Sequence, residues 1–301
     1  MLKSALVDSA VRILLESGYK VVDCRGSRSS FDILAKRDET LYLIKTLANV
    51  EGLSRESVVQ LKAVSAILGG IPYVLSQRMK NSELTDGTVY DRYGVSVSNI
   101  PTFSKLVNDT PPNVYSTRGN YCVHISQKKL THARRRMGLT QDTLAETLGV
   151  TKQSVYRYEH NGRVSLDVFE RLEKLFGNEL ADRDYAPQHG SCEESQDGMT
   201  AATSLKRTVR REFDDMGFHT SITNAPFDLV ASLHERVFSV VSNDWRRLHD
   251  KLTVLEEISA IVDGYTVCIS ERKVESDVNV LTPEELAQVK TAKELFKLLS
   301  D

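Results

Sequence analysis

Four polar side chains fall on one face of a predicted helix and have the types that read the edges of DNA bases. They are Lys152, Gln153, Ser154 and Arg157. Gln pairs bidentately with adenine and Arg with guanine, while Lys and Ser reach bases or phosphates. An α-helix fits the major groove with its N-terminal residues at the base edges. The spacing predicts a base-contacting helix, with Gln141 and Thr151 as further contacts at the starts of two helices.

A second set of residues has the types of a hydrolytic metal site, but it is incomplete. Asp32 opens a predicted hairpin and Lys45 lies on the second strand, so the two should be close in space. In such chemistry carboxylates hold a divalent metal and a lysine positions the attacking water. Two residues before Lys45 the strand carries Leu43 and no second carboxylate. Because a lone carboxylate is a poor metal cage, we expect a structural ion pair or a phosphate contact, with no metal, no cofactor and no catalytic residue.

The elements that must hold the polar face are two helices joined by a tight turn. Thr140 can cap the first helix and Thr151 the second, because a hydroxyl oxygen accepts the free amides of a first turn. Gly149 can end the first helix in a left-handed conformation. The apolar faces are formed by Leu144, Ala145, Leu148, Val155 and Tyr158. The alternative interpretation is an ordinary αα-hairpin with a solvated polar face.

The helix before this motif carries a basic cluster. We predict phosphate contacts at Lys128, Lys129, Arg134 and Arg135, with Arg136 beside them. Between His124 and Gly177 ten Lys and Arg residues face six Asp and Glu residues, whereas the whole chain has a net charge of −2. The positive charge is therefore local, as contact with phosphates requires. A solvated helix face would explain the basic run equally well.

The residues from Gln141 to Glu159 (QDTLAETLGVTKQSVYRYE) resemble the Cro/CI-type (XRE-like) helix-turn-helix family. The resemblance extends over the flanking helices, from Gln127 to Gly177. It implies a five-helix domain that binds double-stranded DNA, usually as a dimer.

The preceding part of the chain predicts a three-layer α/β domain with a mixed sheet, because a helix, three strands, a helix and a strand follow one another. The predicted elements are helices at 4–17 and 55–68 and strands at 19–24, 31–36, 41–45 and 71–76. With Phe31-Asp32-Ile33-Leu34-Ala35 and Leu43-Ile44-Lys45, this order resembles the PD-(D/E)xK nucleases, among them archaeal Holliday-junction resolvases. The resemblance implies a nuclease-like fold in which Leu43 replaces an acid.

The last part of the chain is interpreted as a degenerate repeat of the first. Phe227-Asp228 aligns with Phe31-Asp32, and 262–270 aligns with 68–76. In this alignment Val241 takes the place of Lys45 and Ser239 that of Leu43, so Asp228 is expected to have no catalytic partner. Chance similarity of two α/β segments is the alternative.

The predicted fold is therefore α/β plus all-α, with a central helix-turn-helix domain between two nuclease-like α/β domains. The boundaries are 1–123 for the first α/β domain, 124–177 for the helix-turn-helix, 178–205 for a polar linker and 206–301 for the second α/β domain. From residue 178 onward 14 Lys and Arg residues face 23 Asp and Glu residues. We expect this acidic part to avoid DNA.

Cysteine usage and hydropathy predict a cytoplasmic protein. Cys24, Cys122, Cys192 and Cys268 form no CxxC pair, and three of them lie in apolar strand-like runs that predict buried thiols. No stretch approaches the roughly 18 apolar residues of a membrane span.

The whole arrangement resembles a family of archaeal helix-turn-helix transcriptional regulators. The resemblance implies a sequence-specific DNA-binding regulator that is not an enzyme and acts as a homodimer. One alternative is a metal-dependent nuclease whose second acid is Glu16 or Glu51. Another is a non-catalytic protein that senses a ligand or a protein partner and uses DNA only as an anchor.

Overall fold

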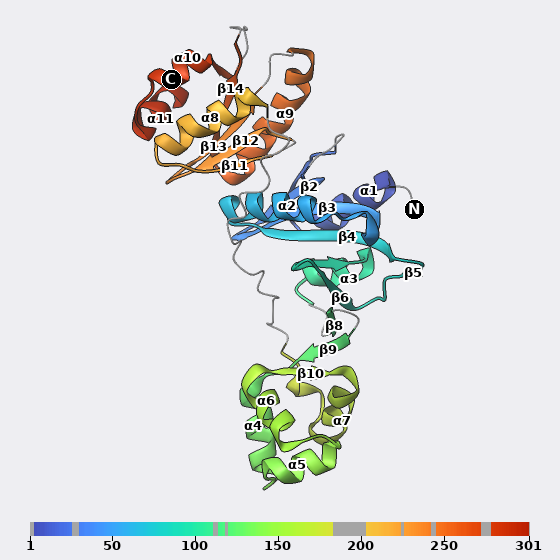
Figure 1. The fold of residues 1–301 in the computed structure, drawn as a ribbon. Helices are drawn as coiled ribbons and strands as arrows, with labels where there is room; N and C mark the ends of the chain where they lie inside the picture. Colours follow the sequence, from blue (N-terminus) through green and yellow to red (C-terminus); the bar gives the residue numbers. More distant parts are fainter. Residues whose placement is uncertain are drawn as a thin grey trace. The chain divides into compact units, whose positions relative to one another are not determined.

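The structure is a computed structural model with two compact units (Figure 1). It describes residues 3–25, 30–110, 114–117, 120–182, 203–223, 226–241, 245–271 and 278–300. The first unit combines residues 1–75 with 189–301, and the second spans 76–188.

The N-terminal half of the first unit is a helix-flanked sheet. Its elements are α1 (Lys3–Glu16), β1 (Lys20–Asp23), β2 (Ile33–Arg37), β3 (Thr40–Asn49), the 3-10 helix η1 (Val50–Gly52), α2 (Arg55–Leu68) and β4 (Ile71–Met79), whose end passes into the second unit. The strands follow the order β1-β2-β3-β4. Ser54 caps α2 through the amide of Ser57, and Gly69 ends it at φ 66°, where glycine is unstrained. The predicted bounds of α2 are confirmed.

The C-terminal half has the same order of elements and then continues. Its elements are α8 (Ser204–Asp215), β11 (His219–Ile222), β12 (Leu229–Ser232), β13 (Arg236–Val241), α9 (Trp245–Val262), β14 (Gly264–Ile269), β15 (Asn279–Leu281), α10 (Pro283–Gln288) and α11 (Ala292–Ser300). The sheet order is β11-β12-β13-β14-β15, with β13, β14 and β15 parallel. The last strand and the two last helices were not predicted.

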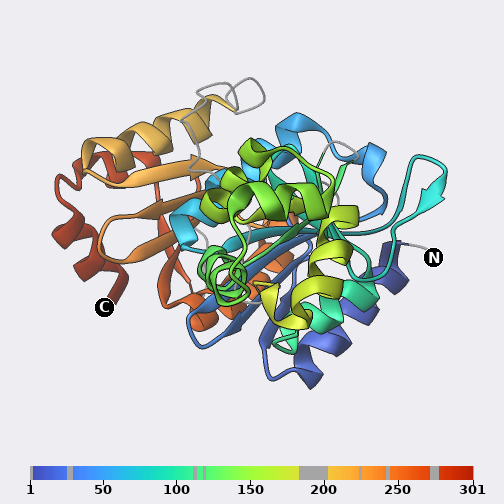
Figure 2. The ribbon, with the colours of Figure 1, turned by 90° about the horizontal axis from the view of Figure 1, so that it is seen from below.

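Helices cover both faces of this second sheet (Figure 2). One hydrophobic cluster joins Phe213 of α8, Leu286 of α10 and Leu295 of α11 to Leu229 and Ala231 of β12. Side chains alternate along a strand, so the buried Val230 between the last two faces the other side of the sheet. Helix α9 packs against β13 and β14.

The two halves of the first unit pack reciprocally. Helix α2 of the N-terminal half contacts β11 and β12, while α9 of the C-terminal half contacts β1 and β2. Arg236 donates hydrogen bonds to the carbonyls of Leu68 at 3.3 Å and Val262 at 2.6 Å, which are the last residues of α2 and α9. One guanidinium therefore satisfies the last carbonyl of each helix, which has no intrahelical donor.

The second unit begins with a small α/β region. It contains the end of β4, β5 (Ser82–Glu83), β6 (Thr88–Arg92), β7 (Val95–Ser98), α3 (Ile100–Val107), β8 (Val114–Thr117) and β9 (Asn120–His124). The strand order is β7-β6-β8-β9-β10, and the pair β6–β8 is parallel.

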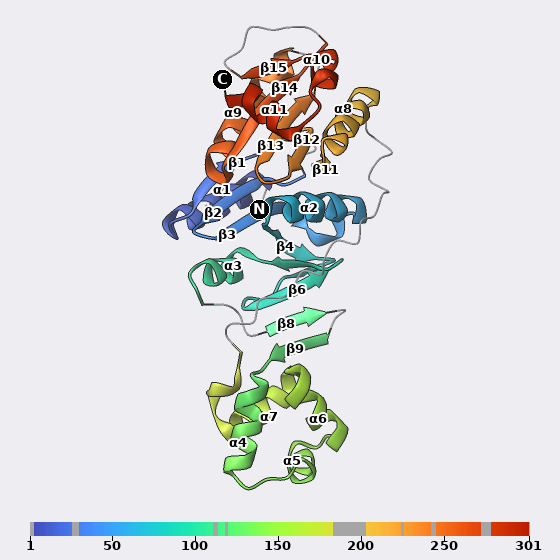
Figure 3. The same ribbon diagram turned by 90° about the vertical axis from the view of Figure 1, so that its left-hand side faces the viewer.

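The helix-turn-helix region of the second unit contains α4, α5, α6 and α7, which Figure 3 labels. Its elements are α4 (Gln127–Arg136), α5 (Gln141–Leu148), α6 (Lys152–Asn161), α7 (Leu166–Phe176) and η2 (Asn178–Leu180), with strand β10 (Arg163–Ser165) between α6 and α7. Leu180 and Ala181 belong to its hydrophobic core. Residues 178–182 therefore extend this region past the predicted start of the linker. No helix in the described ranges is long and apolar enough to cross a membrane.

Candidate nucleic-acid interface

Helices α5 and α6 have the caps and the turn that their sequence predicts. Thr140 accepts the amide of Thr143 and Thr151 accepts that of Ser154, each at 3.1 Å. Gly149 lies between the helices at φ 61°, in the left-handed region that favours glycine. Ala145 is buried at the helix crossing with Leu144, Leu148 and Val155 in one core. These contacts fix the direction of α6.

The outer face of α6 is exposed to solvent. Lys152, Gln153 and Arg157 are exposed, and Ser154 is partly buried. Arg157 donates to the Ser154 hydroxyl at 3.2 Å, which aligns the guanidinium along the helix. Lys152 lies 2.7 Å from Asp142 of α5, but both side chains are 60% exposed, so the ammonium remains accessible.

Tyr156 shares this face and is a further candidate contact that the polar side chains alone do not indicate. It is 51% exposed and stacks on His160 with ring centroids 3.9 Å apart. Its position three residues after Gln153 and one before Arg157 could have revealed it, because residues three and four apart lie on one helix face. The candidate base-contacting surface therefore includes an aromatic ring.

Thr151 and Ser154 have local roles at the start of α6. Their hydroxyls lie 2.9 Å apart, and the Thr151 oxygen also accepts the Ser154 amide. Thr151 stays exposed and Ser154 is partly buried. Both side chains hold the first turn of the helix.

Arg134 corrects one predicted phosphate contact. It is buried, and its guanidinium donates to Glu159 at 2.6 and 3.2 Å and to the Leu139 carbonyl at 2.9 Å. Gln141 donates to the same Glu159 carboxylate at 2.6 Å. Burial raises the pKa of Glu159, but these bonds outweigh it and hold the pKa below its usual range. Arg134 and Gln141 thus join α4 and α5 to α6.

The other basic residues of α4 remain accessible. Lys128, Lys129 and Arg135 are exposed. A shallow groove on this side is lined by Gln127, Lys128, Thr131, His132, Arg135 and Glu159. The charge of Glu159 is balanced by Arg134, so Lys128 and Arg135 make this surface positive. A positive surface next to α6 is suited to contact with phosphate oxygens.

The end of α6 is tied to the sheet of the same unit. Gly162 has φ 64°, and its carbonyl accepts the Ile125 amide at 2.6 Å. A β-carbon at Gly162 would approach the Ile125 oxygen to 2.5 Å, so only glycine fits. Strand β10 then pairs with β9, with Arg163 opposite His124. The end of α6 is therefore joined to this sheet by a backbone hydrogen bond and by the pairing of β10 with β9.

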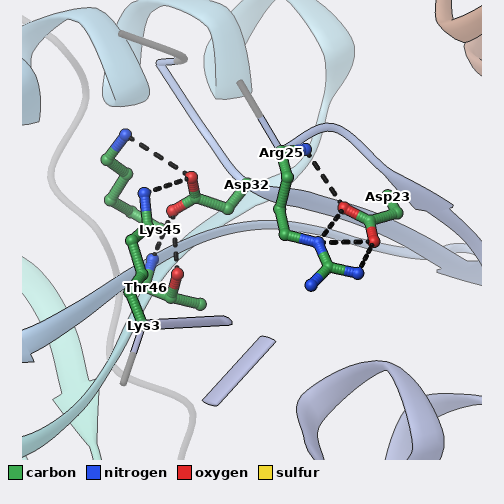
Figure 4. Close-up of polar contacts among 6 residues, drawn as sticks. All are labelled: Lys3, Asp23, Arg25, Asp32, Lys45 and Thr46. Atoms are coloured by element: carbon green, nitrogen blue, oxygen red, sulfur yellow. Dashed lines mark hydrogen bonds and ion pairs between the residues drawn. The ribbon is translucent and has the colours of Figure 1, made fainter. Parts of the chain in front are cut away.

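Asp32 and Lys45 lie together in the first unit, as predicted. The Asp32 side chain is buried, and one oxygen accepts the Thr46 amide at 2.7 Å and the Thr46 hydroxyl at 3.0 Å. Its other oxygen lies 2.8 Å from the Lys3 ammonium and 3.8 Å from that of Lys45 (Figure 4). Leu43 is fully buried. The centre is a buried ion pair with two lysines.

Asp228 forms a second centre, in which its partners are two lysines and a strand amide. Its carboxylate lies 2.7 Å from the Lys206 ammonium and 3.1 Å from that of Lys251, and it accepts the Val241 amide at 2.9 Å. Lys206 lies on α8 and Lys251 on α9. The lysine missing from the strand is therefore replaced by one from a helix.

The alignment of the two hairpins also shifts by one residue. The Asp32 amide donates to the Ile44 carbonyl, and the Asp228 amide donates to that of Ser239. The β12–β13 hairpin therefore places Val240, and not Val241, at the position of Lys45. Phe238, and not Ser239, corresponds to Leu43. The segment from Asp228 to its paired residue Ser239 is one residue shorter than the segment from Asp32 to Ile44. An alignment without a gap therefore places Val241, and not Val240, opposite Lys45.

Comparison with known proteins places the chain in a family. Residues 3–112 match the PD-(D/E)XK superfamily domain, and residues 130–182 match a helix-turn-helix family. A relative from Archaeoglobus fulgidus, named "Putative HTH-type transcriptional regulatory protein", is 31% identical over 99% of this chain and 98% of its own. The chain belongs to this family. No solved structure matches it significantly.

Two further relatives have similar identities and coverage. Proteins with the same type of name from Methanocaldococcus jannaschii and Thermoplasma acidophilum are each 28% identical over 99% of this chain, covering 96% and 97% of their own lengths. The similarity therefore spans both flanking parts and the helix-turn-helix of this family member.

The nuclease-like part of this family member lacks a cluster of metal ligands in its described residues. Within them no group of three or more His, Cys, Asp or Glu side chains could hold a metal ion. The nearby Asp23 is engaged by Arg25 at 2.8 Å. Hard cations need several oxygen ligands, and the described side chains present one carboxylate with two ammoniums.

The cysteines of this family member are buried where the structure describes them. Cys24, Cys122 and Cys268 are free and buried, as predicted, whereas Cys192 lies outside the described residues. Burial raises the pKa of Cys268 to about 11. A thiol held protonated in this way is a weak nucleophile.

Proposed function

We propose that the protein is a sequence-specific DNA-binding transcriptional regulator that uses a Cro/CI-type helix-turn-helix. The observation that carries this proposal is the exposed face of α6, where Gln153 and Arg157 stand on a helix fixed by two caps, a glycine turn and the Arg134–Glu159 pair. A helix held in this way can enter the major groove without reorganising. The names of the relatives support a regulatory role.

The roles of the side chains follow from their exposure. Gln153 and Arg157 read bases, and Lys152 contacts a base or a phosphate. Tyr156 adds an aromatic ring against the backbone or a thymine methyl. Ser154 aligns Arg157 and Thr151 caps the helix. The phosphate contacts are Lys128, Lys129 and Arg135, while Gln141 and Arg134 position Glu159.

The flanking α/β parts serve as a non-catalytic scaffold. Their common element order and their reciprocal packing support two copies of one nuclease-like fold paired within a single chain, before and after the helix-turn-helix. The protein binds as a homodimer to half-sites about 34–36 Å apart, since one such domain covers few base pairs. Because α2 and α9 already contact the other half of their own chain, the dimer interface lies on other surfaces.

Selection of bound sequences from a random duplex pool tests this proposal directly. The wild-type protein should enrich a site with two-fold character. Arg157→Ala and Gln153→Ala should each lose roughly 1–3 kcal/mol on that site and relax the preference at one position. Lys174→Ala, an exposed cation on α7, is the control and should bind like the wild type. Equal affinity for random and selected DNA would contradict sequence-specific binding. It would favour the alternative in which the protein senses a ligand or partner and uses DNA only as an anchor.

A further inference from the structure

Tyr156 places an aromatic ring on an otherwise polar face of α6. The side chain is 51% exposed, although a tyrosine ring gains free energy when it is buried. An α-helix has about 3.6 residues per turn, so Tyr156 lies about 40° around the helix from Lys152 and about 60° from Gln153. The ring therefore stands between these two side chains, one turn farther along the helix, within the candidate base-contacting surface.

His160 holds the ring of Tyr156 in place. The two rings stack with their centroids 3.9 Å apart and an interplanar angle of 26°. Nδ1 of His160 donates to the Tyr156 carbonyl at 2.8 Å, which fixes the imidazole against its own helix. One face of the tyrosine ring is thus covered, so its exposed area belongs to the opposite face and the edge. The ring is ordered before DNA binds, which avoids part of the entropy cost of binding.

An exposed aromatic ring in the major groove favours one feature of a base edge. The hydroxyl of a tyrosine can reach a phosphate, but the ring itself has no donor or acceptor for the edge of a base. The face of the ring carries partial negative charge and packs against apolar groups. The apolar group that a base presents in the major groove is the C5-methyl of thymine. A 5-methylcytosine places the same methyl group there.

We propose that Tyr156, held by His160, reads the C5-methyl group of a pyrimidine in the major groove. Tyr156 is then a specificity-determining residue and His160 a positioning residue. The inference rests on the proposed sequence-specific function and adds the chemical group that one position of the site must carry. Side chains three residues apart on a helix face lie about 5–6 Å apart, and base pairs follow one another at about 3.4 Å. The methyl group should therefore lie within about two base pairs of the position that Gln153 reads.

The test starts from the DNA site that the full wild-type chain enriches from a random duplex pool. Each thymine of either strand is replaced in turn by deoxyuridine, which lacks only the C5-methyl, and affinities are measured at one salt concentration. Cytosine and 5-methylcytosine, each paired with guanine, are then placed at the sensitive position. Tyr156→Ala removes the ring, and Tyr156→Phe keeps the ring without the hydroxyl. Tyr121→Ala, at a tyrosine of β9 that is 42% exposed, is the matched control.

Deoxyuridine at one position should weaken binding by the wild type about fourfold, or about 0.8 kcal/mol, as expected for the loss of one buried methyl group. This ratio of affinities should fall to one in Tyr156→Ala and persist in Tyr156→Phe and Tyr121→Ala. His160→Ala should give an intermediate ratio. Because the ratio compares two DNAs with one protein, a general loss of stability does not change it.

The source of the methyl group is identified at the same position. The wild type should bind 5-methylcytosine more tightly than cytosine by a similar factor, and Tyr156→Ala should bind the two equally. Tighter binding of the thymine site than of the 5-methylcytosine site would identify thymine as the base that is read, and the reverse would identify 5-methylcytosine.

Three results would overturn the inference. Equal affinity for thymine and deoxyuridine at every position, or a ratio that survives in Tyr156→Ala, would do so and leave sequence-specific binding intact. Loss of affinity in both Tyr156→Ala and Tyr156→Phe with unchanged ratios would do so by assigning the hydroxyl to a phosphate. Enrichment of no site at all would overturn the proposed function and this inference together.

Discussion

Phe31 and Phe227 contact each other between the two halves of the first unit. Their ring centroids are 6.0 Å apart at an interplanar angle of 58°, and both side chains are fully buried. Each phenylalanine directly precedes the buried aspartate of its half. Phe238 lies 5.2 Å from Phe227 and extends the aromatic contact into the second sheet. The two halves therefore share a core and should unfold together.

Replacing Phe227 with alanine should destabilise the whole first unit. Loss of a buried phenylalanine costs about 3–5 kcal/mol through lost burial and the cavity that remains. Leu15→Ala, at a side chain that is 57% exposed on α1, is the control and should cost about 0.5 kcal/mol or less. Hydrogen exchange of β2 and β12 peptides in rising denaturant measures both. Loss of protection confined to β12 would mean that the halves unfold independently.

The pair Arg134–Glu159 should stabilise the helix-turn-helix far more than the pair Lys152–Asp142. The first pair is 11% and 5% exposed, whereas both members of the second are 60% exposed. Glu159→Ala leaves a buried guanidinium unpaired and should cost about 3–5 kcal/mol. Asp142→Asn should cost no more than about 1 kcal/mol. Hydrogen-exchange protection of α4 and α6, measured in Glu159→Ala and in Asp142→Asn, compares the two costs.

The pair Arg134–Glu159 should make the stability of the helix-turn-helix region depend on pH. The pKa of Glu159 is lowered in the folded protein by Arg134 and Gln141 despite burial. Its stabilisation is therefore complete above the unfolded pKa, about 4.3, and is lost as pH falls through the lower folded value. The difference in protection between wild type and Glu159→Ala should shrink at acidic pH. A difference that stays constant down to pH 2 would contradict this assignment.

The helix-turn-helix could be predicted closely because its signals are local. Thr140, Gly149 and Thr151 act within their own turns, and the apolar spacing fixes which face of α6 is buried. Arg134 could not be assigned in the same way. Its sequence neighbours suggest a solvated basic run, but its partner Glu159 is 25 residues away and only the packed helices bring them together.

The order of helices and strands in the α/β parts could be predicted, but the residue-by-residue correspondence of the two hairpins could not. The Asp32–Lys45 contact follows from one hairpin, so the spacing sufficed. The contact between Lys251 and Asp228 depends on how α9 lies across the sheet, which no local pattern encodes. Strand β15 and helices α10 and α11 follow the stretch that aligns with the first half, so the repeat gave no information about them.

Gly162→Ala should disturb the junction between α6 and the sheet more than Gly138→Ala disturbs the end of α4. Both glycines have positive φ, 64° and 67°. An added β-carbon meets the Ile125 oxygen at 2.5 Å at Gly162 and nothing within 4 Å at Gly138. Gly138→Ala should cost about 1–2 kcal/mol from backbone strain alone, and Gly162→Ala clearly more. Thermal unfolding and exchange in β9 measure this, and equal costs would contradict the close approach.

His124 should make the β9–β10 junction sensitive to mild acid. Burial, and after it the charge of Arg163, lower the pKa of His124 to about 4, while Asp182 opposes this shift. The unfolded chain, with a pKa near 6.5, then binds more protons, so this contribution is complete above about pH 6.5 and is lost as pH falls towards 4. The ring packs edge-on against Tyr115 at 5.4 Å.

His124→Phe keeps an aromatic ring there and removes the titration. Exchange protection of β9 should fall between pH 6.5 and 4 in the wild type and change less in the variant. An identical pH profile in the two proteins would show that another group titrates at the junction.

The last prediction is that the nuclease-like part does not cleave DNA. Asp32 is held by Thr46, Lys3 and Lys45, and Leu43 occupies the position of a second acid, so a divalent cation would meet one carboxylate and two ammoniums. Repulsion by the lysines and the shortage of oxygen ligands both oppose metal binding. The full chain, incubated with duplex and four-way-junction DNA in magnesium and then manganese, should cut neither.

Variants separate a true activity from a contaminating nuclease. Asp32→Asn keeps an oxygen for the Thr46 amide and removes the charge, while Lys45→Met keeps the side-chain length, so both should fold. Cleavage that appears in the wild type and disappears in both variants would establish the metal-dependent nuclease. Cleavage equal in all three proteins would come from elsewhere. With Lys45 3.8 Å from Asp32 and a buried leucine beside it, we expect no cleavage, since the lysine has no bound metal and water to act with.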